Sequence, residues 1–245
     1  MGKYVIGIDV GGRSVKFGLF TEEGELVNKS NIVTRVEENG KYILTDIYDH
    51  LLNIFEKYDI KNDDLIGIGL GVPGSVHNQS FVQTAVNLGW KNVDMRALFR
   101  DKFDYKVKVE NDANVAALGE YWQGAAKEMD NIVMVTLGTG VGGGIIIDGK
   151  VHSGVTGSGG EIGHMPILEE PLSRTCGCGG HRCFELVGSA PGLESLANEY
   201  LFNTEEDSVL RNIEEFCAKD VFEAYKVECK GAARIVEKYD YYLSI

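Results

Sequence analysis

Residues Lys3–Phe20 read KYVIGIDVGGRSVKFGLF, two short apolar runs separated by an acid and a glycine pair. Both runs are rich in β-branched and aromatic residues, which predicts two strands, Lys3–Val10 and Ser14–Phe20. A Glu-Gly turn then leads to a third predicted strand, Leu26–Ile32. The chain is therefore expected to open with a β-meander, whose first turn carries the acid beside the glycines.

That first turn has the composition of a phosphate-binding loop. Gly11 and Gly12 let backbone N–H groups approach a phosphate closely, and Asp9 can hold a hydrated Mg2+. Glycine pairs between strands are common, so a plain hairpin with a solvated Asp9 is an open alternative for this stretch alone.

A second stretch repeats the pattern. The run Asn131–Leu137 (NIVMVTL) predicts a buried strand, and Ile145–Asp148 predicts another. Between them lies GTGVGGG, residues 138–144, with five glycines in seven positions. No Gly-Lys-Ser/Thr and no helix follow directly, so this is neither a Walker A nor a Rossmann loop. It is interpreted as a second phosphate-type loop, with a glycine-rich hairpin as the alternative, and its recurrence indicates an internal duplication.

Between the two loops the pattern is that of an α/β protein. Helical spacing of apolar residues predicts a helix over Asn39–Tyr58, and LIGIGLGV predicts a buried strand, Leu65–Val72. Pro73–Ser75 then forms a turn at the carboxyl end of that strand, a usual place for ligands in open α/β sheets. Asn87–Trp90 is predicted to be a polar loop, in which the tryptophan packs rather than serving as a ligand platform.

The next strand–helix junction carries a candidate base. Tyr105–Glu110 predicts a strand, and a helix follows Asn111 and Asp112. Either of these two residues could cap the helix. Asp112 could instead face a cleft as a general base, although the local pattern alone favours the cap.

Three cysteines crowd into eight residues, Cys176, Cys178 and Cys183, with His164 upstream. Three thiols and an imidazole form a common closed structural zinc set. No secretory signal is recognisable, so disulfides are disfavoured, and the remaining alternative is three buried free cysteines. Glu161 and Glu185 flank the set, which indicates a polar pocket for a hydroxyl-rich ligand. The distant Cys217 and Cys229 are expected to be buried small apolar residues.

Composition excludes several classes of function. The net charge of the 245 residues is −13, whereas nucleic-acid binding needs clustered Lys and Arg, and an anionic membrane surface would repel such a chain. No apolar run approaches the ~20 residues of a membrane span. A cytoplasmic protein without nucleic-acid or membrane partners is expected.

Together these motifs resemble the ROK family of sugar kinases, and its bacterial glucokinases in particular. They occur in family order from Ile6 to Glu185, as IGIDVGGRSVKFGLF, GVPGSV, NLGW, ENDANVAALGE, VTLGTGVGGGII, GGEIGH and CGCGGHRCFE. The resemblance implies a duplicated, actin-like ATPase (ribonuclease H-like) α/β fold with two lobes and a cleft. The implied lobes are residues 1–112 and 113–245, the second lacking the family's C-terminal strand and glycine-rich adenosine turn.

The resemblance also implies an activity and residue roles. The activity is ATP-dependent phosphorylation of a hexose, with glucose first and fructose or an N-acylmannosamine as alternatives, in a homodimer that uses ATP, Mg2+ and structural Zn2+. Asp112 would be the catalytic base. The sugar would be bound by Gly74, Asn111, Asp112, Glu161, His164 and Glu185. The Mg-ATP phosphates would be surrounded by Asp9, Gly11, Gly12, Lys16, Gly138, Thr139 and Gly140. The zinc would be held by His164, Cys176, Cys178 and Cys183.

Three departures from the family pattern accompany the resemblance, of which the missing C-terminal adenosine segment is one. Arg13 stands where such kinases usually have threonine, and Arg182 replaces a glycine before the last cysteine. Two other functions stay open. One is a sugar-binding ROK protein without kinase activity. The other is a ROK repressor, which is disfavoured because the chain opens on a strand rather than on a helix-turn-helix.

Overall fold

The computed structural model describes residues 3–95, 99 and 105–245, and it divides the chain into two compact units. The first unit comprises residues 1–133 and 144–160, and the second comprises residues 134–143 and 161–245. The chain therefore passes from one unit to the other three times. The predicted lobe boundary after Asp112 stays a prediction.

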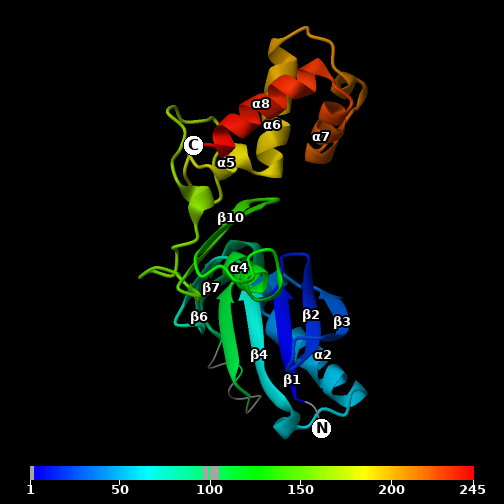
Figure 1. Ribbon diagram of the computed structural model, residues 1–245, viewed down its shortest axis with the longest axis vertical. Coiled ribbons are helices and arrows are strands. Elements are labelled where there is room, and N and C mark those ends of the chain that lie inside the picture. Colours follow the sequence, from blue (N-terminus) through cyan, green and yellow to red (C-terminus); the bar gives the residue numbers. More distant parts are fainter. Residues whose placement is uncertain (1–2, 96–98, 100–104) are drawn as a thin grey trace. The chain divides into compact units, whose positions relative to one another are not determined.

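The first unit is built on a five-stranded sheet with the order β3-β2-β1-β4-β8 (Figure 1). Strands β1 to β3 form the predicted meander, whereas β4 and β8 run parallel to β1. The strand bounds are β1 Tyr4–Val10, β2 Ser14–Thr21, β3 Leu26–Val33, β4 Leu65–Val72 and β8 Val107–Asn111. A separate antiparallel sheet, β5-β6-β7, contains β5 Ser75–His77, β6 Phe81–Ala85 and β7 Trp90–Asp94.

Helix α2, Ile43–Lys57, covers one face of the main sheet (Figure 1). Its apolar stripe, Ile43, Ile47 and Leu51, is at most 1% exposed and shares one core with the inward residues of β1 and β2. The helix starts later than predicted, since Glu38 and Asn39 have positive φ angles in the short turn α1, Glu37–Gly40. Such angles interrupt a right-handed helix.

Trp90 is not in a polar loop, which corrects that prediction. It begins β7, one residue after the short 3-10 helix η2, Val86–Leu88, and is 5% exposed. Its indole N–H donates a hydrogen bond of 3.2 Å to the Gly40 carbonyl oxygen. The packing role expected for this tryptophan is thus confirmed, although its surroundings are strand and core.

Helix α4, Asp112–Gln123, follows β8 and packs against the backbones of two strands. A Cβ placed on Gly71 of β4 would lie 3.6 Å from the Asp112 Cα. A Cβ on Gly144 would lie 2.5 Å from the Ala117 Cβ, far inside van der Waals contact. The contact at Gly71 would accept a Cβ, whereas the helix can lie this close to position 144 only because that residue is glycine.

Gly144 belongs to a second, three-stranded sheet with the order β11-β10-β9. Its strands are β9 Ile132–Leu137, β10 Val141–Ile147 and β11 Lys150–Val151. Strand β10 begins four residues earlier than predicted. Only residues 138–140 form the turn, and glycines 142–144 belong to the strand, which corrects the longer loop.

The second unit is mainly helical, and its core lies between α6 and α8 with α7 beside them. Tyr239 of α8 donates a 2.8 Å hydrogen bond to the Gly188 carbonyl oxygen and so fixes the end of α5. The bounds are α5 Glu185–Gly188, α6 Ala190–Asn203, α7 Ala218–Lys226 and α8 Lys230–Leu243. Short 3-10 helices lie in both units, η1 at Asn62–Asp64, η3 at Ile162–His164 and η4 at Val209–Asn212.

Cys217 and Cys229 are not buried core residues, which corrects that expectation. Cys217 is exposed and precedes α7, where its backbone N–H donates to Asp220. Cys229 is half-buried before α8, with its sulfur 3.4 Å from the Ser208 hydroxyl oxygen. Both are the N-cap residues of their helices, and Cys229 packs against the edge of the helical core. No helix in the described ranges is long and apolar enough to cross a membrane.

Candidate active site

Two turns and the first residue of α4 lie at the carboxyl edge of the main sheet in the first unit. Strands β1, β4 and β8 are parallel, so the residues that follow them leave the sheet at the same edge. These are the Gly11–Arg13 turn, the Pro73–Gly74 turn and Asp112. Ligands of open α/β sheets bind at such edges.

The Gly11–Arg13 turn is held by hydrogen bonds that the sequence could not reveal. The Gly11 N–H donates to the Ser14 carbonyl oxygen at 3.1 Å. Thr34, which follows β3, donates two hydrogen bonds to this turn. Its hydroxyl donates to the Gly11 oxygen at 2.6 Å, and its N–H donates to the Arg13 oxygen at 3.2 Å. The backbone of this turn is therefore fixed, whereas the Arg13 residue is exposed.

Asp9 and Lys16 face each other across the β1–β2 ladder. Their side chains form an ion pair of 2.9 Å in which both are about half exposed, at 51% and 55% respectively. Hydrogen bonding to Asp9 raises the pKa of Lys16, and the charge of Asp9 adds to this rise. Both predicted phosphate-site residues thus lie together beside the glycine turn.

The junction of β8 and α4 assigns the cap to Asn111. Its side-chain oxygen accepts the N–H groups of Ala113 at 2.9 Å and Asn114 at 3.1 Å, and its Nδ2 donates to the Gly74 oxygen at 3.1 Å. Asp112 is the first residue of the helix and remains exposed. The cap is therefore Asn111, which leaves the carboxylate of Asp112 accessible.

The electrostatics of Asp112 differ from those of a surface carboxylate. Surrounding protein displaces water and raises the pKa of Asp112, the nearby charge of Asp9 raises it further, and the Ala113 N–H partly opposes the rise. A carboxylate with an elevated pKa is a better proton acceptor, which is the property a general base needs.

In the second unit, residues 138–140 join β9 to β10. The Gly138 N–H donates to the Gly140 oxygen at 3.0 Å. The Gly138 carbonyl accepts the Ala190 N–H at 2.8 Å, at the start of α6. The Val141 N–H donates to Glu185 Oε2 at 3.1 Å.

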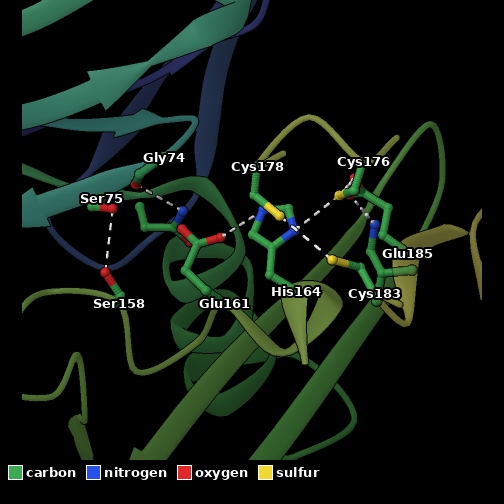
Figure 2. Close-up of polar contacts among 11 residues, drawn as sticks. Gly74, Ser75, Ser158, Glu161, His164, Cys176, Cys178, Cys183 and Glu185 are labelled. Carbon is green, nitrogen blue, oxygen red and sulfur yellow. Dashed lines mark hydrogen bonds and ion pairs between the residues drawn. The ribbon is translucent and has the colours of Figure 1, made fainter. Parts of the chain in front are cut away.

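The predicted metal ligands lie together. The ligand atoms of His164, Cys176, Cys178 and Cys183 are all within 4.8 Å of one another (Figure 2). Cys176 Sγ lies 3.3 Å from His164 Nδ1, and Cys178 Sγ lies 3.4 Å from Cys183 Sγ. A tetrahedral zinc, with Zn–S bonds of about 2.3 Å, holds its sulfurs about 3.8 Å apart. The donor set and its spacing therefore fit zinc.

The thiols have unequal proton affinities. Burial raises the pKa of Cys176 to about 12 and also raises the pKa of Cys183, whereas the Gly180 N–H lowers the pKa of Cys178. Cys176 and Cys183 are buried and Cys178 is exposed. Backbone hydrogen bonds shape the loop as well, such as that from the Cys176 N–H to the Gly180 oxygen at 2.8 Å.

The flanking acids approach the cluster from two sides (Figure 2). Glu161 Oε2 lies 3.6 Å from His164 Nε2, so the imidazole faces the thiols with Nδ1 and the acid with Nε2. Glu185 Oε1 lies 3.3 Å from Cys176 Sγ. Between Glu161 and His164, a Cβ on Gly163 would lie 2.2 Å from the Val141 oxygen, so glycine is required there.

Arg182, the departure in the cysteine loop, does not need a positive φ angle. Its guanidinium donates to the Leu168 carbonyl oxygen. Its own carbonyl accepts the N–H groups of Ile167 at 3.0 Å and Leu168 at 3.3 Å. The arginine therefore ties the cysteine loop to the preceding segment.

The structure thus places the predicted residues in two groups, one in each unit. The first unit holds Asp9, Gly11, Gly12, Lys16, Gly74, Asn111 and Asp112. The second holds Gly138, Thr139, Gly140, Glu161, His164, Cys176, Cys178, Cys183 and Glu185. Sequence reasoning missed Thr34 and Ala190, whose contacts join distant segments and leave no local signal.

The sheet order and the aspartate at its carboxyl edge define an α/β protein with the actin-like ATPase fold. Residues 5–245 match the ROK family profile, and the chain belongs to that family. It is 38% identical over 245 residues to the glucokinase of Halalkalibacterium halodurans, covering 98% of this chain and 74% of that one. The predicted fold class and family are thereby confirmed.

Two further comparisons bear on function. A ROK family glucokinase from Streptomyces griseus, solved in complex with glucose and AMPPNP, matches with a TM-score of 0.74 and 29% identity. That match covers 98% of this chain and 76% of the other. The xylose repressor of Caldicellulosiruptor bescii is 31% identical over 225 residues, covering 91% of this chain and 56% of the repressor. The relatives thus include both sugar kinases and repressors.

Proposed function

We propose that this chain is a sugar kinase that transfers the γ-phosphoryl group of ATP to a hexose, with glucose as the favoured substrate. The observation that carries the proposal is Asp112. It is the accessible first residue of α4, at the edge of the sheet where the Gly11–Arg13 turn lies, and its pKa is raised. The similarity to glucokinases supports the sugar-kinase activity.

In this proposal Asp112 accepts the proton of the attacking sugar hydroxyl while the oxygen forms its bond to the γ-phosphorus and ADP leaves. Phosphoryl transfer depends mainly on positioning and electrostatic stabilisation. Asn111, which bonds the Gly74 oxygen, orients the start of α4 and with it the base. A positioned base contributes about 10²–10⁴-fold to rate.

The remaining residues have binding roles. The Gly11–Arg13 turn and residues 138–140 would present N–H groups to the ATP phosphates. Mg2+ bound near Asp9 would supply charge neutralisation there. Sugar hydroxyls would be bound by Gly74, Asn111, Glu161, His164 and Glu185. Zinc at the cysteine cluster would hold the loop that carries His164, because protein ligands fill all four positions.

The test is an assay of sugar 6-phosphate and ADP after the protein is mixed with Mg-ATP and each of glucose, fructose, mannose and N-acetylmannosamine. Asp112→Asn should lower kcat by about 10²–10⁴-fold with sugar affinity largely kept. The control Asp63→Asn changes an exposed acid of the same unit and should retain full activity. Undiminished turnover in Asp112→Asn would remove the base assignment.

A sugar-binding protein without kinase activity is the second candidate. It is favoured by the similarity to the xylose repressor. This second function would be supported if calorimetry shows sugar binding while the protein forms no sugar phosphate and does not bind AMPPNP. Homodimer formation and a cytoplasmic location remain proposals; light scattering and cell fractionation, respectively, test them.

A further inference from the structure

Both ends of the turn at residues 138–140 are held by one segment, which runs from the start of α5 at Glu185 to the start of α6 at Ala190. The Gly138 carbonyl accepts the Ala190 N–H at 2.8 Å, and the Val141 N–H donates to Glu185 Oε2 at 3.1 Å. The two bonds lie on either side of the turn, so its position depends on where this segment lies.

The same segment begins at a predicted metal ligand. Cys183 is 4% exposed and precedes α5 by two residues, and its carbonyl accepts the Leu186 N–H at 3.1 Å. The following bond, from the Val187 N–H to the Phe184 oxygen, is 3.0 Å. Because these bonds close a helical turn around Glu185, a movement of Cys183 moves the carboxylate.

The carboxylate is also confined by packing. A Cβ on Gly140 would lie 2.5 Å from Glu185 Oε2, so the carboxylate lies close against this glycine, and a side chain at position 140 would displace it. Its other oxygen, Oε1, lies 3.3 Å from Cys176 Sγ. Glu185 thus contacts Cys176 with Oε1 (Figure 2), and its Oε2 accepts the Val141 N–H beside the glycine turn.

We propose that Glu185 is a positioning residue that couples the occupancy of the Cys3His metal centre to the conformation of the turn at residues 138–140. Metal binding fixes Cys183, Cys183 fixes the start of α5, and Glu185 then holds the Val141 N–H. The link uses backbone geometry, so it does not depend on the Cys176 S–H contact. It goes beyond the sugar-binding role proposed for Glu185.

The first measurement is the rate of amide hydrogen exchange at Val141. NMR monitors this rate in zinc-loaded and in zinc-stripped protein. Loss of a hydrogen bond to a charged acceptor should speed exchange at least about tenfold. Stripping zinc should have this effect in the wild type. Glu185→Ala should show fast exchange even with zinc bound, with about one zinc still retained per chain.

Glu194→Ala is the matched control. Glu194 accepts the Ala218 N–H at 2.9 Å in the same unit, away from the cluster. This variant should speed exchange at Ala218 and leave the zinc dependence at Val141 intact. Slow exchange at Val141 in zinc-loaded Glu185→Ala would overturn the proposal, as would equal rates with and without zinc in the wild type. If zinc removal unfolds the unit, the zinc-loaded variants alone decide.

The second measurement rests on the proposed function. If the turn binds nucleotide phosphate, zinc should tighten AMPPNP binding, and AMPPNP should tighten zinc binding by the same factor. Glu185→Ala should abolish both effects. An absence of AMPPNP binding in every protein, together with the exchange pattern above, would refute the kinase and leave the coupling intact. A zinc effect that persists in Glu185→Ala would refute the coupling.

Discussion

Replacing Gly144 by alanine tests whether α4 lies as close to β10 as the structure shows. The added Cβ would be 2.5 Å from the Ala117 Cβ and 2.6 Å from the Ala113 oxygen. Carbon atoms normally meet at about 3.5–4.0 Å, so the helix must move by about 1 Å. Overpacking of this kind costs about 1–3 kcal/mol, which corresponds to about 2–12 °C in Tm for a chain of this size.

The assay is urea denaturation with linear extrapolation, followed by kinase activity. Because Asp112 is the first residue of α4, Gly144→Ala should also lower kcat. Gly119→Ala is the control in the same helix. No atom lies within 4 Å of its added Cβ, and removing a helical glycine should stabilise the protein by about 0.5–1 kcal/mol without loss of activity. A Gly144→Ala protein as stable and active as the wild type would refute the close approach.

Three further predictions follow from single contacts. Because the pKa of Asp112 is raised in the folded protein, folding favours the protonated carboxyl. Its contribution to the free energy of unfolding is complete below the ordinary pKa of 3.8 and is lost as pH rises through the raised pKa. Asp112→Asn should therefore raise the free energy of unfolding at pH 7 by up to about 1 kcal/mol, since the group is exposed, and the gain should vanish below about pH 3.8; a gain that grows toward acid would contradict the sign. Trp90→Phe removes the donor to the Gly40 oxygen and should cost about 1–3 kcal/mol in urea denaturation, so a loss below about 0.5 kcal/mol would show that the bond is dispensable. Elemental analysis should find about one zinc per chain, and Cys178→Ser should release it. A metal-free wild type that still binds sugar would show that sugar binding does not depend on the zinc site.

The sequence predicted the parts of the fold that local pattern determines. The β-meander and β4 follow from alternating or continuous apolar runs bounded by glycine turns. The boundaries failed where backbone angles override pattern. Helix α2 begins at Ile43 because Glu38 and Asn39 have positive φ angles, which helical apolar spacing does not reveal. Trp90 resembled a loop residue because β7 has only five residues, of which Trp90 alone is buried, and so gives little periodic signal.

The sequence named candidate site residues, whose sugar and nucleotide roles stay predictions, and it did not show the hydrogen bonds between them. The spacing of Cys176, Cys178 and Cys183 identifies a metal cluster by itself, and the structure brings their sulfurs together. The bond between Glu185 and the Val141 N–H joins residues 44 positions apart, and no local rule connects them. Glycines also have two uses that composition cannot separate. Residues 138–140 form a turn, whereas Gly144 permits helix packing.

The three passages of the chain between the units, after residues 133, 143 and 160, have a practical consequence. A single truncation of the gene cannot yield either unit alone. The helical unit includes residues 134–143, which lie in the sequence between the two segments of the first unit. A protease that nicks one passage leaves two covalent tethers intact. Expressing the helical half alone therefore requires residues 134–143 to be spliced to residue 161, and simple deletion of the first 160 residues would leave it without its glycine turn.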